Sequence, residues 1–168
     1  MRIDEILPAA IASIKDGHAA SDTPALDAEL LLADVLESSR AFLFSHPDFV
    51  LDAPQVNRYQ SLINRRVLGE PIAYILGQRE FWSLSLRVDS AVLIPRPDTE
   101  CLIEAILQLT LPSKARAIDL GTGSGAIALA LASEKPSWDV FATDASAAAL
   151  SIAKSNSNNL AAQVLCPS

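Results

Sequence analysis

The residues best suited to chemistry are three glycines at alternate positions, Gly121, Gly123 and Gly125, between an apolar run and an apolar helical pattern. This order predicts a strand, a sharp turn and a helix. The glycines let the backbone approach a ligand where a side chain would collide. Asp144 ends a second strand-like run 19 residues beyond Gly125, near the spacing of roughly 20 residues at which an acid meets ribose hydroxyls. The stretch predicts a nucleoside-cofactor site.

Asp119, two positions before the first glycine, indicates which nucleoside is bound. The glycine spacing also fits the dinucleotide fingerprint of nicotinamide enzymes, but a carboxylate there would oppose a pyrophosphate at the helix N-terminus. S-adenosylmethionine has no phosphate and carries an ammonium and a sulfonium, which a carboxylate favours. The pattern D-x-G-x-G-x-G resembles motif I of the class I S-adenosylmethionine-dependent methyltransferases. A tight turn without a ligand is the plain alternative. The expected cofactor-binding residues are Asp119, Gly121, Thr122, Gly123, Ser124, Gly125 and Asp144.

A second informative stretch, residues 94–100, reads Ile-Pro-Arg-Pro-Asp-Thr-Glu. Two prolines hold Arg96 in an extended segment, and Asp98 is expected to cap a helix over residues 99–109. Arg96 and Glu100 are expected to lie close together. The segment is either a rigid linker with a surface ion pair or a corner of the cofactor pocket, bordered by Arg96, Pro97 and Glu100.

Residues 1–71 carry helical signals only and predict a small bundle without catalytic residues. Asp4 is expected to cap the first helix, with a late start or a kink at Pro8. Thr23-Pro24 opens a helix over residues 25–37, and a short helix is expected over residues 40–45. The fourth helix is expected to begin at a capping box of Asp52 and Gln55 and to end at Gly69.

The periodicity changes after residue 72. Alternation around residues 81–88 predicts a β-hairpin within residues 72–94, and Gly77 and residues 88–90 are turn candidates. Trp82 is expected to pack in a core rather than to stack on a ligand. Residues 95–168 then predict the first part of a Rossmann-like α/β domain: a helix, a strand over 115–120, a helix, a strand ending at Asp144, a helix over 145–158 and a third strand at 162–165.

The 168 residues carry a formal net charge of −7, which argues against direct nucleic-acid binding. Residues 1–71 hold 11 acidic and 6 basic residues, which would suit a basic protein partner, although a solvated acidic surface explains them equally well. Cys101 and Cys166 lack partners at disulfide or metal spacing, and Cys101 is expected in the core. We find neither a long apolar span nor a leader, so we expect a cytoplasmic protein without membrane contact. We also expect a monomer that binds no metal.

Two motifs together resemble a family. Pro-Arg-Pro-Asp-Thr-Glu at residues 95–100 and Asp-Leu-Gly-Thr-Gly-Ser-Gly at residues 119–125 look like those of the N5-glutamine methyltransferases of peptide chain release factors. Residues 69–74 and 79–82 also match that family's interdomain region. The resemblance implies a helical domain (1–71) that binds the release factor, a hairpin linker (72–94) and part of a methyltransferase domain (95–168). It also implies methylation of the glutamine amide in the Gly-Gly-Gln motif of release factors, with S-adenosylmethionine as donor.

The sequence departs from the family in one respect that concerns catalysis: the Asn-Pro-Pro-Tyr motif that clamps the acceptor amide is absent from these 168 residues. We therefore expect a fragment without its acceptor clamp, inactive by itself, and the catalytic residues stay unknown. One edge of the strand at residues 115–120 would then be unpaired and apolar. Two other functions stay open: an adenine N6 methyltransferase, which shares that type of clamp, and a non-catalytic module that binds a release factor.

Overall fold

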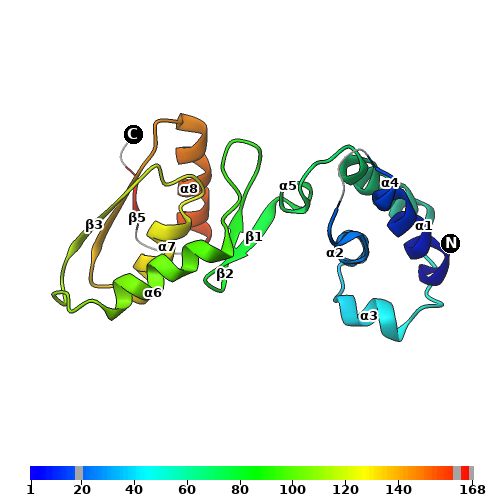
Figure 1. The fold of residues 1–168 in the computed structure, drawn as a ribbon, viewed down its shortest axis with the longest axis horizontal. Helices are drawn as coiled ribbons and strands as arrows, with labels where there is room; N and C mark the ends of the chain where they lie inside the picture. Colours follow the sequence, from blue (N-terminus) through cyan, green and yellow to red (C-terminus); the bar gives the residue numbers. More distant parts are fainter. Residues whose placement is uncertain (18–20, 161–163, 167–168) are drawn as a thin grey trace. The chain divides into compact units, whose positions relative to one another are not determined.

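The computed structural model describes residues 1–17, 21–160 and 164–166. The chain divides into two compact units, Met1–Leu76 and Gly77–Ser168, which are drawn in Figure 1 and described separately below. Within the described residues, no helix is both long enough and apolar enough to cross a membrane.

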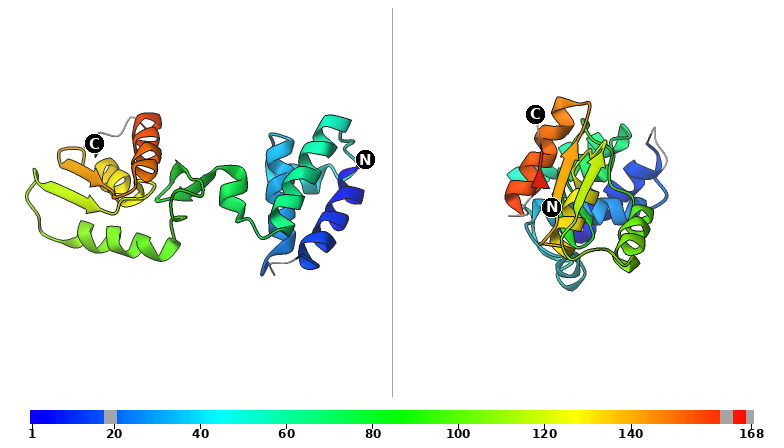
Figure 2. Two further views of the ribbon diagram at one scale, coloured as in Figure 1. Left: turned by 90° about the horizontal axis from the view of Figure 1, so that it is seen from above. Right: turned by 90° about the vertical axis from the view of Figure 1, so that its left-hand side faces the viewer.

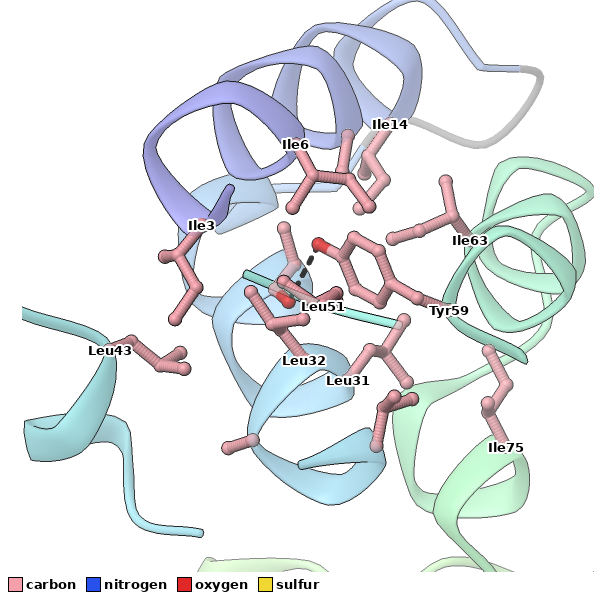
Figure 3. Packing of buried hydrophobic residues seen from close by; sticks show 14 residues of the cluster. Ile3, Ile6, Ile14, Leu31, Leu32, Leu43, Leu51, Tyr59, Ile63 and Ile75 are labelled. Atoms are coloured by element: carbon pink, nitrogen blue, oxygen red, sulfur yellow. Dashed lines mark hydrogen bonds between the residues drawn. The ribbon is translucent and has the colours of Figure 1, made fainter. Parts of the chain in front are cut away.

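The first unit is a helical bundle. Its helices are α1 (Ile3–Lys15), α2 (Pro24–Val35), α3 (Arg40–Ser45), α4 (Ala53–Val67) and α5 (Ile72–Leu76). The apolar stripe of each longer helix faces one shared core, as helical periodicity requires. In Figure 3, Ile6 and Ile14 of α1 face Tyr59 and Ile63 of α4. Tyr59 is only 1% exposed, and its hydroxyl donates to the carbonyl of Ala28 in α2 at 3.0 Å, which satisfies the phenol within the core.

The expected helix ends are confirmed in part. The box at Asp52 and Gln55 is present, because each side chain accepts the other residue's backbone N–H, at 2.8 and 3.0 Å. After α4, Gly69 has a φ of 96°, the left-handed conformation that ends a helix. The expectation of a late first helix capped by Asp4 is wrong. The helix α1 begins at Ile3 and contains Pro8, and the Glu5 carboxylate accepts the N–H of Arg2 at 2.8 Å.

The second unit opens with an antiparallel hairpin of β1 (Gln78–Phe81) and β2 (Leu84–Arg87). The hairpin is shorter than expected, because residues 72–76 form α5 in the first unit. The connecting turn is Trp82-Ser83, which the sequence did not predict. The predicted turn candidates flank the hairpin: Gly77 has a φ of 73°, and the N–H of Val92 donates to the carbonyl of Asp89 at 3.1 Å. Both residues of the connecting turn have positive φ, 51° and 59°, as a type I′ turn demands. Sequence patterns miss this turn because tryptophan and serine seldom adopt that conformation.

The segment 97–109 starts differently from the expected capped helix. Pro97–Thr99 form a 3₁₀ turn (η1), and α6 follows at Glu100–Gln108. Asp98 lies inside the 3₁₀ turn and does not cap α6, and the Thr99 side chain makes no capping hydrogen bond either. Cys101 is exposed, so its expected place in the core is wrong.

A parallel sheet of β3 (Arg116–Leu120), β4 (Asp139–Thr143) and β5 (Val164–Leu165) completes the described part of this unit, in the order β3-β4-β5. The right-hand view of Figure 2 shows β3 and β4 side by side and pointing the same way. The crossovers are α7 (Ala126–Glu134) and α8 (Ala147–Asn159). The expected third strand is present at residues 164–165, and its residues 162–163 lie outside the described part. The α/β class, with a helical bundle, a hairpin and the start of a Rossmann-like domain, is confirmed.

Among the described strands, β3 pairs on one side only. Its Ile118 and Leu120 are 64% and 79% exposed. The sheet therefore has the apolar edge that the sequence predicts.

Candidate functional site

The turn after β3 is tied to the neighbouring strand β4. The N–H groups of Gly121 and Thr122 both donate to the carbonyl of Thr143, each at 2.9 Å. Gly121 and Gly123 have φ values of 78° and 56°, a conformation that costs little only for glycine. The turn therefore stands at the carboxyl ends of β3 and β4, where ligands bind in open parallel sheets.

Asp144 lies at the end of β4 and faces this turn. Its carboxylate accepts the N–H of Ser146 and the N–H of Gly123, both at 2.9 Å. These hydrogen bonds, that of Ser146 first, hold the pKa of Asp144 below its ordinary value. The carboxylate is half-buried and ionised at neutral pH, and it keeps lone pairs with which it could accept a hydroxyl of a ligand.

Asp119, in β3, is half-buried, and its carboxylate accepts the hydroxyl of Thr122 at 2.7 Å. This bond orients the Thr122 side chain within the turn. It leaves the charge of Asp119 unpaired, since no ion pair of Asp119 occurs within the described residues. A cation near the turn would thus meet an uncompensated carboxylate.

Gly125 is the N-cap residue of α7 and has a φ of 85°. A Cβ at this position would lie 3.1 Å from Cδ1 of Leu129 and 3.3 Å from Cβ of Ala153 in α8. The glycine therefore permits the close packing of α7 against α8, a role distinct from that of the two glycines before it.

A cavity of about 190 Å³ adjoins the turn. Arg96 and Thr99 line it together with residues 121–124, and Phe81 of β1 contributes a further wall. The structure therefore brings Arg96 together with four of the predicted cofactor residues. It does not bring Pro97, Glu100, Asp119, Gly125 or Asp144 into the lining of this cavity. Pockets for drug-sized ligands usually measure about 300–1,000 Å³, so this cavity would hold only part of a cofactor.

Glu100 does not pair with Arg96, contrary to the expected ion pair. Its carboxylate instead accepts the N–H of Trp82 in the hairpin turn at 2.9 Å. The Trp82 indole is partly buried against the core, as expected, and its Nε1–H donates to Glu134 at 2.8 Å. The carboxylates of Glu100 and Glu134 thus both bind Trp82, in a turn whose positive φ values are unfavourable for tryptophan and serine.

Asn156, on α8, contacts the glycine turn, and sequence reasoning missed it. Its Nδ2 donates to the carbonyl of Ser124 in the glycine turn at 2.8 Å, and it is 1% exposed. A signal was present, because Ala149, Ile152, Ala153 and Asn156 follow the i, i+3, i+4, i+7 spacing of a buried stripe. In a run of serines and asparagines the position looks like solvated surface, and only its place on that stripe distinguishes it.

Both units are similar to known proteins. Residues 9–77 match the family model described as PrmC N-terminal domain, and residues 97–166 match the methyltransferase small domain. The chain is 58% identical over 137 residues to the release factor glutamine methyltransferase of Coxiella burnetii, covering 81% of this chain and 50% of the relative. It is 49% identical over 142 residues to that of Shewanella oneidensis and 48% identical over 142 residues to that of Escherichia coli, with 84% of this chain covered in each case and 50% and 51% of the relative.

The matched models agree with the fold, in which a helical domain precedes the start of a Rossmann-like methyltransferase small domain. The chain is similar along both units to release factor glutamine methyltransferases, and the resemblance inferred from its motifs is confirmed. It spans about half the length of the curated relatives that it matches.

Proposed function

We propose that the protein acts in the transfer of a methyl group from S-adenosylmethionine to the side-chain amide of the glutamine in the Gly-Gly-Gln motif of peptide chain release factors, and that this chain supplies the site for the donor. The observation that carries this proposal is the glycine turn between Asp119 and Asp144, in a chain whose relatives are named release factor glutamine methyltransferases. The proposed compartment is the cytoplasm and the proposed state is a monomer.

The proposed cofactor site consists of Asp119, residues 121–125 and Asp144. Asp144 would accept hydroxyls of the ribose with its remaining lone pairs, and the exposed surface of the turn would lie against the adenosyl group. The unpaired charge of Asp119 supports a cationic ligand, because a carboxylate attracts an ammonium or sulfonium and repels a pyrophosphate. Arg96 borders the adjoining cavity.

The bundle of residues 1–71 is proposed to hold the release factor, with residues 72–94 as the linker and residues 95–168 as the partial methyltransferase domain. Within residues 1–71, 11 acidic residues against 6 basic ones support a basic protein surface as the partner. No direct contact with nucleic acid is proposed, because the net charge is −7.

An amide nitrogen is a poor nucleophile because its lone pair is delocalised into the carbonyl. S-adenosylmethionine supplies a methyl group activated by its sulfonium; the N–CH₃ bond forms as the S–CH₃ bond breaks, and the nitrogen loses one proton to solvent. The residues of this chain would bind and orient the donor for in-line transfer. The 168 residues contain no Asn-Pro-Pro-Tyr segment to hold the acceptor amide, so we propose that they transfer negligible methyl by themselves.

The test has two parts. Calorimetry of residues 1–168 with S-adenosylmethionine should show saturable binding, whereas NAD should show none. Incubation with a release factor and methyl-labelled cofactor should label the factor only when a relative of full length is supplied, and a Gln→Asn release factor should stay unlabelled. Binding of NAD in place of S-adenosylmethionine would contradict the cofactor assignment, and robust labelling by residues 1–168 would contradict the proposed inactivity.

The absence of that segment also favours a second candidate, a non-catalytic module that binds a release factor through its helical bundle. Binding of the release factor without any binding of S-adenosylmethionine would favour the module. Binding of the cofactor would favour the enzyme.

A further inference from the structure

One buried carboxamide joins the hairpin to the glycine turn. The Oδ1 of Asn156 accepts the N–H of Arg87 at 2.7 Å, and its Nδ2 donates to the carbonyl of the same residue at 3.0 Å. The side chain thus pairs with both backbone groups at the end of β2, much as a neighbouring strand would. The second Nδ2 hydrogen bond, to Ser124, satisfies a carbonyl in the turn.

The peptide group between Ser124 and Gly125 is held at both ends. Its carbonyl accepts the Nδ2–H of Asn156, and its N–H donates to the carbonyl of Thr122 at 2.9 Å. The Thr122–Gly123 peptide is fixed separately, because Asp144 accepts the N–H of Gly123. A peptide held at both ends cannot rotate, so Asn156 sets which way the backbone groups of the turn point.

Asn156 also connects two walls of the cavity beside the turn. Phe81 of β1 forms one wall and residues 121–124 form the other. Arg87, which Asn156 holds, pairs with Gln78 in the hairpin that carries Phe81. One amide therefore holds the turn directly and the hairpin at the end opposite Phe81, although it does not line the cavity itself.

We propose that Asn156 is a positioning residue for the cofactor: it fixes the Ser124–Gly125 peptide and the hairpin in the arrangement that binds the adenosyl group. This inference rests on the proposed cofactor role of the glycine turn. The side chain acts through Ser124 and Arg87, and it need not touch the ligand.

Two substitutions test this role. Asn156→Leu keeps the approximate volume and removes all three hydrogen bonds, whereas Asn156→Ser keeps a small polar group and serves if the leucine variant fails to fold. The matched control is Val140→Ala, which shortens a buried side chain in β4 that lies outside the lining of the cavity. It should lower the unfolding midpoint without disturbing the turn.

The measurements are calorimetric titration with S-adenosylmethionine and with S-adenosylhomocysteine, well below each unfolding midpoint, and amide NMR spectra of the ligand-free chain. We expect the Asn156 variants to bind both ligands about tenfold or more weakly, and the amide signal of Gly125 to shift and exchange faster with solvent. Val140→Ala should match the wild type in both readouts.

Wild-type affinity in Asn156→Leu or Asn156→Ser, with an unshifted Gly125 amide, would overturn the inference even if the midpoint falls. Equal weakening by Val140→Ala would overturn it as well, because lost stability alone would then explain the effect. A wild-type chain that binds neither ligand would refute the proposed function and the cofactor role of Asn156 with it.

Discussion

Replacement of Asp144 by asparagine tests the proposed cofactor site most directly. The carboxylate accepts two backbone N–H groups, from Gly123 and Ser146, each at 2.9 Å. Asparagine offers one oxygen and one NH₂ group, so one of the two N–H donors would face another donor. Asp144 is only half-buried, so we expect the substitution to lower the free energy of unfolding of the ligand-free chain by about 1 kcal/mol.

The effect on binding should be larger than the effect on stability. A hydrogen bond to a charged acceptor contributes about 1.5–3 kcal/mol, which corresponds to roughly ten- to hundredfold in the dissociation constant for the lost ribose contact. Calorimetry at pH 7 measures this. Asp139→Asn is the matched control, because it removes the same charge at the other end of β4, where the carboxylate is largely exposed and lies 3.7 Å from Arg116. Asp144→Asn binding within about twofold of the wild type would refute the ribose assignment.

The pH dependence of Asp144 follows from the direction of its pKa shift. The N–H groups of Ser146 and Gly123 lower the folded-state pKa, so the stabilisation is complete above the unfolded pKa of about 3.9 and is lost as pH falls below it. Chemical denaturation between pH 3 and pH 7 should therefore show a smaller acid loss in Asp144→Asn than in the wild type. An identical loss of stability at low pH in both proteins would contradict the lowered pKa of Asp144.

Three further predictions concern other parts of the chain. Ser83→Gly should stabilise the second unit by about 0.5–1 kcal/mol, because Ser83 has a φ of 59° in the hairpin turn, and a lower unfolding midpoint would contradict this. Asp119→Asn should weaken the binding of S-adenosylmethionine more than the binding of S-adenosylhomocysteine, the product whose sulfur is uncharged. Equal weakening of both in competition titrations would show that the charge of Asp119 does not act on the sulfonium. Tyr59→Phe should lower the free energy of unfolding of the helical unit by about 1 kcal/mol, because the hydrogen bond to the carbonyl of Ala28 is lost. Burial raises the pKa of Tyr59, so its contribution should fade as the pH rises above about 10, and denaturation curves of wild type and variant should converge there.

Sequence alone determined the elements whose causes are local. Alternate glycines dictate a turn that other residues could not adopt, so the residue types by themselves predict that residues 119–125 link a strand to a helix. The capping box of Asp52 and Gln55 fixed the start of α4 for the same reason, since its hydrogen bonds span only three residues.

Tertiary structure alone decided the contacts that join distant segments. Glu100 binds the hairpin turn at Trp82 instead of its near neighbour Arg96, and the turn keeps its unfavourable backbone because of that contact. Asn156 has the residue type of a solvated surface position, yet it becomes the buried partner of Arg87 and Ser124. Hydrogen bonds between segments 18 to 69 residues apart depend on how the elements pack, and no local pattern records that packing.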